Sequence, residues 1–500
     1  MKDIYSEIRN IQQQFFELLD NHFKTERSEL EPLLSAYDKN DHLIYTNIDE
    51  KAYEIGRKSP IVSFEGREIP GLTYKAILLV RDIHSFWAKH HKTLYEAIIQ
   101  IPYTKLHSKS SFQTLINEVR STALYVDTVV ADDWIFSLRE ATEDHKRPLS
   151  GDLGVNILKE YIFLWSFRKL ILADIVPPIL IICPSPHYAD PDLRKVSNKL
   201  SLWLALRYAN VLYGQTFNSI NDLIDYTQNF TNISDLTKQI AKPNLIWEEG
   251  DTLESKIERK LYIASNSFQI SGSSDEIIDI NPGMAIIIHE MSGFDVIAQQ
   301  KIDNEILDLE PRVPRYHWDE FLWSLNQRTE LTKDHDKISE ETAVVRILEN
   351  KEMSWLGNIP LEKLIELRSE GRMEEMRTLI RESNERLKFA DFSKVSELAQ
   401  EVKANLEDAL MKHESDLKSQ EMMSRLKIQT SVTELLVSGW IALVTTKVPE
   451  LSIPGSIFGL AVGGSSVWDV IAKVNGFKIK AAEESRRPIG ILWDAFSKGK

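Results

Sequence analysis

The residues best suited to chemistry follow two apolar segments in the first half of the chain. Asp132 and Asp133 end the apolar segment that begins at residues 123–130, which are rich in β-branched and aromatic side chains. His187 and Asp190 follow a second apolar run that prolines close. Two or more carboxylates and an imidazole gathered at one place could hold a divalent ion or serve as acid and base.

Two parallel strands would have to position these residues. The apolar segments 125–130 and 179–183 are separated by an apolar helical pattern over residues 155–173. A strand, a helix and a further strand are typical of a right-handed βαβ crossover. Because ligands bind outside the carboxyl ends of parallel strands, we expect the four residues to gather there. The alternative is that these acids only form turns and cap helices, as Asp190 before Pro191 is suited to do.

The other patterns predict a helix-rich α+β fold with a small, partly parallel sheet. Apolar residues recur at helical spacing in several segments, and short apolar runs bounded by glycine, proline or polar residues predict strands or turns. Helices are expected at residues 1–24, 73–101, 110–121, 190–214, 253–265, 360–371 and 373–387, and short strands at 43–47, 61–64, 244–247, 277–280, 284–289 and 294–298.

Composition narrows the classes of function. The formal net charge of -15 repels phosphate backbones, so nucleic-acid binding is not expected. Cys183 is the single cysteine, which excludes a disulfide within the chain and fits a reducing compartment. Its apolar surroundings predict a buried, unreactive thiol. The first 24 residues lack the apolar core of a signal peptide, so we expect a cytoplasmic protein. Neither a Walker A loop nor a dinucleotide-binding glycine motif is present, and no cofactor is expected.

The C-terminal part combines a long amphipathic helix, over residues 392–428, with an apolar block at 435–474. Gly459 and Gly463 have the spacing that lets helices approach closely, so the block predicts a helical hairpin. Such a hairpin could be buried in the core, form a subunit interface or enter a membrane. The contact residues would be Trp440, Phe458, Gly459, Gly463 and Trp468.

These patterns predict three parts: a globular domain over residues 1–330, a helical arm over 331–430, and the hairpin with a basic tail over 431–500. Because strong catalytic motifs are missing, the sequence favours a binding or regulatory protein. It would act through protein partners or self-association, with membrane contact through the hairpin as an added expectation. The alternative is an enzyme that uses Asp132, Asp133 and His187, with or without a metal ion.

Overall fold

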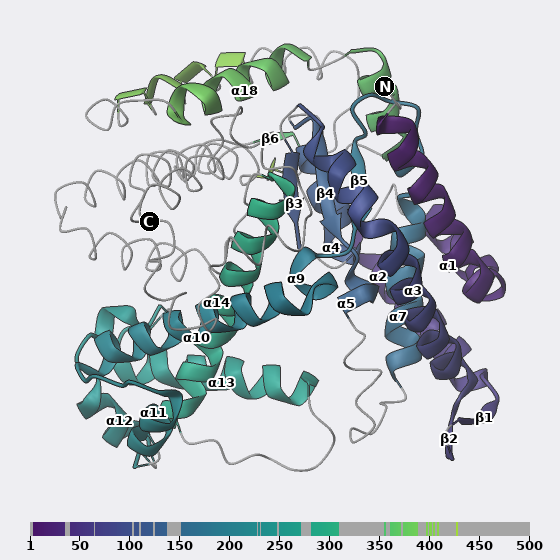
Figure 1. The fold of residues 1–500 in the computed structure, drawn as a ribbon. Helices are drawn as coiled ribbons and strands as arrows, with labels where there is room; N and C mark the ends of the chain where they lie inside the picture. Colours follow the sequence, from purple (N-terminus) through teal and green to yellow (C-terminus); the bar gives the residue numbers. More distant parts are fainter. Residues whose placement is uncertain are drawn as a thin grey trace. The chain divides into compact units, whose positions relative to one another are not determined.

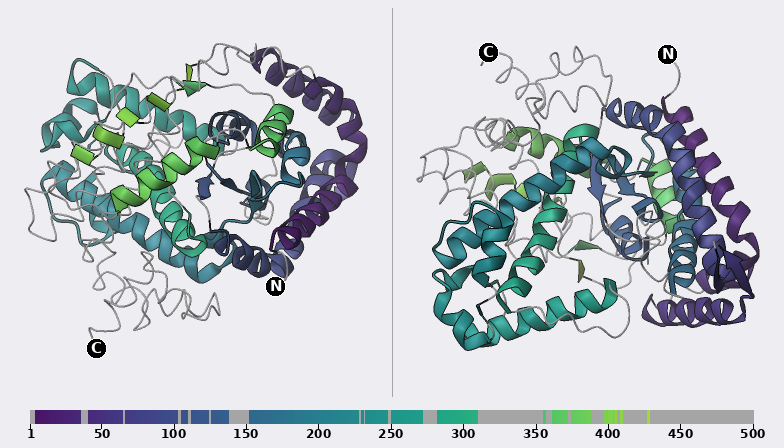
Figure 2. Two further views of the ribbon diagram at one scale, coloured as in Figure 1. Left: turned by 90° about the horizontal axis from the view of Figure 1, so that it is seen from above. Right: turned by 60° about the horizontal axis from the view of Figure 1, so that its bottom comes forward.

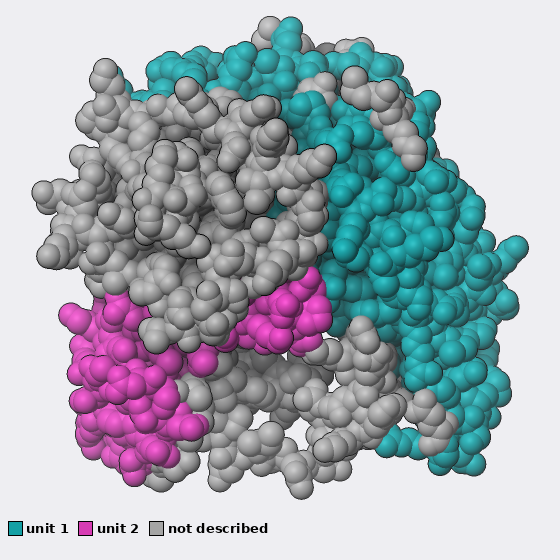
Figure 3. Space-filling view, viewed as in Figure 1, with its two compact units in different colours: residues 1–189, 304–312, 340–447 teal, residues 190–303, 313–339, 448–500 magenta. Residues whose placement is uncertain are grey.

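The computed structural model is mostly helical with small sheets, as the sequence predicts. It describes residues 4–35, 41–64, 66–102, 105–109, 112–123, 126–137, 152–227, 229–230, 232–247, 250–271, 282–309, 355–356, 361–371, 374–388, 397–398, 400–402, 404–405, 408–409 and 427–428. The chain divides into two compact units (Figure 3). Unit 1 comprises residues 1–189, 304–312 and 340–447, and unit 2 comprises residues 190–303, 313–339 and 448–500.

A three-stranded parallel sheet lies at the centre of unit 1 (Figure 1). Its order is β3 (Lys105–Ser108), β4 (Thr128–Asp132) and β5 (Leu180–Cys183), and every residue of the three strands is buried. β4 and β5 are parallel neighbours, which confirms the predicted βαβ arrangement. Cys183 is fully buried, as expected. β3 was not predicted. It runs parallel to β4, so the carboxyl ends of all three strands lie at the same edge of the sheet.

Helices surround this sheet and supply most of the core of unit 1. α1, α3 and α7 pack together beside it (Figure 2). At one crossing Gly154 lets α7 approach α3 closely, because a Cβ there would lie 2.6 Å from the backbone nitrogen of Thr73. The unit contains α1 (Ile4–Ser35), α2 (Asp41–Lys58), the hairpin β1 (Ile61–Phe64) and β2 (Arg67–Pro70), α3 (Gly71–Ile99), α4 (Phe112–Thr122), α5 (Trp134–Ser137), α7 (Asp152–Ser166), α8 (Arg168–Ile171), α9 (Pro186–Ala189), β6 (Trp355–Leu356), α17 (Leu361–Ser369), α18 (Glu374–Lys388) and β7 (Lys427–Ile428).

The outer edge of β5 is covered by a glutamine of α1. Gln12 Nε2 donates to the carbonyl oxygen of Ile182 at 2.7 Å, and the Ile182 N–H donates to Gln12 Oε1 at 3.1 Å. Gln12 is fully buried, so both backbone groups would otherwise be removed from water without a partner. The side-chain amide therefore takes the place of one residue of a neighbouring strand.

Unit 2 is built from helices packed around aromatic side chains such as Tyr208, Tyr213 and Phe294. Asp190 caps its first helix, and Gly214, with φ of +62°, ends that helix, as the sequence predicts. The elements are α10 (Pro191–Tyr213), α11 (Ile220–Thr227), α12 (Ile233–Gln239), the 3₁₀ turn η1 (Pro243–Leu245), α13 (Leu253–Ser271) and α14 (Pro282–Leu307). The division between the units falls inside α14, after Asp303.

Several predicted strands are helices or turns instead. Residues 284–289 and 294–298 lie within α14, residues 43–47 lie within α2, and residues 244–247 overlap the turn η1. In α14 the glycines at 283 and 293 divide a long apolar helix into short runs, and such runs cannot be told from buried strands by periodicity alone. Residues 277–280 lie outside the described part of the chain.

Other predictions also fall outside the described residues: the hairpin at 435–474, its contact residues Trp440, Phe458, Gly459, Gly463 and Trp468, and the boundary near residue 330. Partner binding and membrane contact through that hairpin therefore stay predictions. In the part of the chain that the structure does describe, no helix is long and apolar enough to cross a membrane.

Candidate functional site

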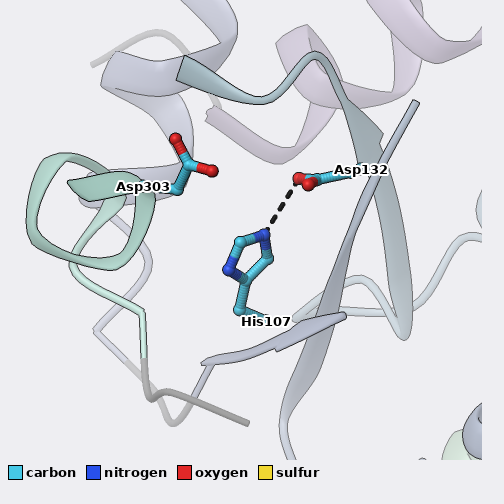
Figure 4. A group of neighbouring side chains, drawn as sticks. All are labelled: His107, Asp132 and Asp303. Atoms are coloured by element: carbon cyan, nitrogen blue, oxygen red, sulfur yellow. Dashed lines mark hydrogen bonds and ion pairs between the residues drawn. The ribbon is translucent and has the colours of Figure 1, made fainter. Parts of the chain in front are cut away.

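A buried histidine and a buried aspartate meet at the carboxyl edge of the parallel sheet. His107 lies in β3, and Asp132 is the last residue of the neighbouring strand β4. His107 Nε2 lies 2.9 Å from Asp132 Oδ1 (Figure 4). His107 is fully buried and Asp132 is 9% exposed, so little water screens this pair.

The C-terminal turn of α14 holds His107 from its other side. His107 Nδ1 lies 2.6 Å from Oδ1 of Asn304, which is itself buried. Lys105, two residues earlier and so on the same face of β3, donates to the carbonyl oxygen of Ile98 and lies 3.4 Å from Asp308 Oδ2. Two residues of β3 are thus held by Asn304, in the last turn of α14, and by Asp308, which directly follows the helix. The contact with Asn304 fixes the orientation of the imidazole.

Both nitrogens of the His107 ring face oxygen atoms. A neutral imidazole carries one N–H, so it can donate to only one of these oxygens. The amide nitrogen of Asn304 is buried and has no partner among the residues that the structure describes. Three arrangements satisfy the ring: a positively charged imidazolium, an Asn304 amide rotated by half a turn, or a cation between His107 Nε2 and Asp132.

A second carboxylate is available to such a cation. Asp303 immediately precedes Asn304 in the unbroken helix α14, so its position follows from the bond between Asn304 and His107. His107, Asp132 and Asp303 each offer one ligand atom, and these atoms all lie within 4.8 Å of one another (Figure 4). A histidine nitrogen with carboxylate oxygens is a ligand set that divalent metals accept.

Asp133 supports the structure next to this pair. Its side chain accepts hydrogen bonds from Trp87 Nε1 at 2.7 Å and from the backbone N–H groups of Ile135 and Phe136, which open α5. Burial raises the pKa of Asp133 to about 6, against the effect of these donors. Asp133 therefore caps a helix, which is the alternative role considered for the acids that follow strands.

His187 and Asp190 also make contacts within their own segments. His187 Nδ1 lies 2.6 Å from Ser185 Oγ, and its ring packs on Tyr188. Asp190 Oδ1 accepts from the N–H groups of Asp192 and Leu193. Of the four residues predicted for the site, Asp132 is the one that the structure joins to a titratable side chain of another strand, and that partner, His107, was not predicted.

The sequence carries only a weak signal for His107. Leu106 is the single apolar residue among residues 105–108, so this segment lacks the sustained alternation that predicts a strand. Asp308 and Asn304, the partners of Lys105 and His107, lie about 200 positions later, at the C-terminal end of α14 and directly after it. A signal that depends on so distant a partner cannot be found from local spacing.

No protein-family model, curated protein or solved structure matches this chain.

Proposed function

We propose that this protein is a hydrolytic enzyme whose active site is the carboxyl edge of the β3–β4–β5 sheet, around His107 and Asp132. The observation that carries the proposal is the 2.9 Å contact between His107 Nε2 and Asp132 Oδ1 at the ends of adjacent parallel strands. Open α/β sheets bind their ligands at this edge.

The pair has properties that hydrolysis requires. An imidazole beside a carboxylate can orient a water molecule and help remove its proton, either directly or through a bound ion. Burial strengthens these interactions relative to bulk water. The anchor from α14 through Asn304 holds the ring in one orientation, as a preorganised site needs.

Activity of the full-length protein tests this proposal. The protein is assayed against a panel of chromogenic esters, phosphate monoesters and phosphodiesters, with divalent ions present, and any activity is compared with that of His107→Gln and Asp132→Asn. We expect both substitutions to lower kcat by about 10²–10⁴-fold, the usual contribution of a positioned acid–base group. Retention of full activity in both folded variants, or a complete lack of hydrolysis across the panel, would count against the proposal.

Matched controls separate a loss of chemistry from a loss of fold. His84→Gln changes a histidine that packs on Phe136, and Asp82→Asn changes an exposed carboxylate that pairs with His22. Both residues lie in α3, away from β3 and β4 in the chain. These two variants should keep the activity of the unmodified protein, and circular dichroism of all four should show the same helical content.

A further inference from the structure

We infer that His107 and Asp132 bind a divalent transition-metal ion of the Mn²⁺ or Zn²⁺ type, with the neighbouring carboxylate of Asp303 as a further ligand. The inference deepens the proposed function, and rests on it for the chemical role of the ion. Binding itself is argued from the geometry and charge of the pair.

The hydrogen bond on the Asn304 side decides which nitrogen is available. With Asn304 Oδ1 as the acceptor at 2.6 Å, the ring places its N–H on Nδ1. A neutral ring then has a lone pair on Nε2, which lies 2.9 Å from a carboxylate oxygen of Asp132. Two acceptors this close in a buried site repel unless a proton lies between them or both bind one cation beside them. A metal-bound histidine ordinarily donates its other N–H to an oxygen in this way.

The separation of the two atoms suits ligands of one ion. Two ligands about 2.1 Å from a metal, at right angles, lie about 3 Å apart. The observed distance from His107 Nε2 to Asp132 Oδ1 is 2.9 Å. All three ligand atoms, with that of Asp303 included, lie within 4.8 Å of one another, which leaves coordination positions for water or substrate.

Charge also favours a bound cation. A neutral His107 ring and the Asp132 carboxylate together carry a formal charge of -1, and burial makes such a charge costly. A cation bound by the pair offsets this charge. Lys109 Nζ lies 3.9 Å from the other Asp132 oxygen, so it contributes only a longer-range ion pair.

The ligand types select the class of metal. Carboxylates alone favour Mg²⁺ and Ca²⁺, whereas an imidazole ligand favours transition metals such as Mn²⁺, Zn²⁺ and Fe²⁺. The single cysteine, Cys183, is not one of the residues whose ligand atoms converge with those of His107 and Asp132, so thiolate ligation is not expected here. We therefore expect Mn²⁺ and Zn²⁺ to bind in preference to Mg²⁺.

Titration of the metal-free full-length protein with Mn²⁺, followed by electron paramagnetic resonance of the free ion, tests the inference without any activity assay. We expect one Mn²⁺ per chain, displaced by Zn²⁺ and not by an equal amount of Mg²⁺. His107→Gln and Asp132→Asn should each weaken Mn²⁺ binding by at least about 10-fold. His84→Gln and Asp82→Asn should leave it unchanged.

The outcomes separate this inference from the proposed function. If the unmodified protein takes up no Mn²⁺ or Zn²⁺, or if binding is the same in His107→Gln and Asp132→Asn, the inference is wrong. Hydrolysis that depends on His107 but persists in chelator, without metal uptake, would support the proposed hydrolase and contradict the metal site. Stoichiometric Mn²⁺ binding that depends on both residues, without hydrolysis, would support the metal site and contradict the proposed hydrolase.

Discussion

The two ends of β4 carry buried aspartates in opposite electrostatic surroundings. Asp127, just before the strand, is 3% exposed and faces two arginines: Arg381 NH2 lies 3.3 Å from both of its oxygens, and Arg377 Nε lies 3.6 Å from one. Asp132, at the other end, faces the His107 ring and a lysine at 3.9 Å. Two guanidinium groups thus face the carboxylate of Asp127, whereas an imidazole and a more distant ammonium group face that of Asp132.

Arginine also binds the backbone at the amino end of β4. Arg368, in α17, donates from NH1 to the carbonyl oxygens of Ala123 and Val126, and from NH2 to that of Asp127. Burial lowers the pKa of Arg368 to about 10, yet the group stays charged at neutral pH. Several arginine contacts therefore stabilise the amino end of β4, whereas the carboxyl end is where we propose that a metal ion binds.

The largest expected effect is on the amino end. Arg368→Ala removes three hydrogen bonds and leaves buried carbonyl oxygens without donors, so it should lower the free energy of unfolding by about 3–5 kcal/mol. Urea denaturation measures the change. Arg386→Ala, which breaks an exposed pair with Glu401, is the control and should cost less than about 1 kcal/mol. Equal losses of unfolding free energy in the two variants would show that the arginine contacts do not specially stabilise the amino end of β4.

Replacing each aspartate by asparagine tests the comparison directly. Asp127→Asn leaves buried arginines without their carboxylate and should destabilise the fold by about 3 kcal/mol, with little change in Mn²⁺ affinity. Asp132→Asn should cost less than about 1 kcal/mol and abolish tight Mn²⁺ binding, since it relieves an uncompensated acceptor. Parallel urea and Mn²⁺ titrations of both variants decide the matter. The distinction fails if Asp132→Asn is the more destabilising of the two.

The partly buried carboxyl of Glu160 adds a test of the electrostatic argument through pH. Burial raises the pKa of Glu160 to about 7, although its Oε2 accepts from the Phe112 N–H. A raised folded-state pKa means that the protonated form is favoured in the fold. Stability from this group is therefore full below pH 4.5 and is lost as the pH rises through 7. Between pH 5 and 8 we expect a loss on the order of 2–3 kcal/mol.

Glu160→Gln isolates this contribution because glutamine does not titrate and can still accept from Phe112. Denaturation midpoints of this variant should vary less with pH than those of the unmodified protein. Identical pH slopes for the two proteins would show that Glu160 titrates normally in the fold.

The smallest expected effect comes from a neutral group that satisfies the sheet edge. Gln12→Leu removes a donor and an acceptor from Ile182 and should cost about 1–3 kcal/mol. Gln13→Leu changes the adjacent exposed glutamine, whose partner is Glu17, and should lie within about 0.5 kcal/mol of the unmodified protein. A cost for Gln12→Leu no greater than for Gln13→Leu would mean that water satisfies this edge.

Local patterns predict the segments that are buried among apolar residues and the caps whose contacts lie within their own helix. β4 and β5 are apolar over most of their length and lie between helices, so composition and spacing predict both strands and their parallel pairing. The caps of α10 were also predictable, because Asp190 and Gly214 act on their own helix. α14 was missed because a helix buried on most sides has no polar face, and its internal glycines resemble turns.

The candidate site was predictable only in part, for a different reason. Asp132 could be found from its position after an apolar strand. His107 could not be found in this way. A buried polar side chain needs a hydrogen-bond partner, and the partner of His107, Asn304, lies 197 residues away in the sequence. The hydrogen bonds from Arg368 to the backbone of residues 123–127 join positions more than 240 residues apart, so local spacing does not predict them.

The link between Gln12 and Ile182 has a consequence for how the chain is made. The two residues are separated by 170 positions, so α1 emerges from the ribosome long before the strand that it covers. At about 5–20 residues per second, roughly 10–30 s pass between the two events. During this time the apolar face of α1, which includes the buried Phe15 and Leu19, has to remain soluble or be held by a chaperone. Folding of unit 1 is therefore expected to wait until β5 has left the ribosome.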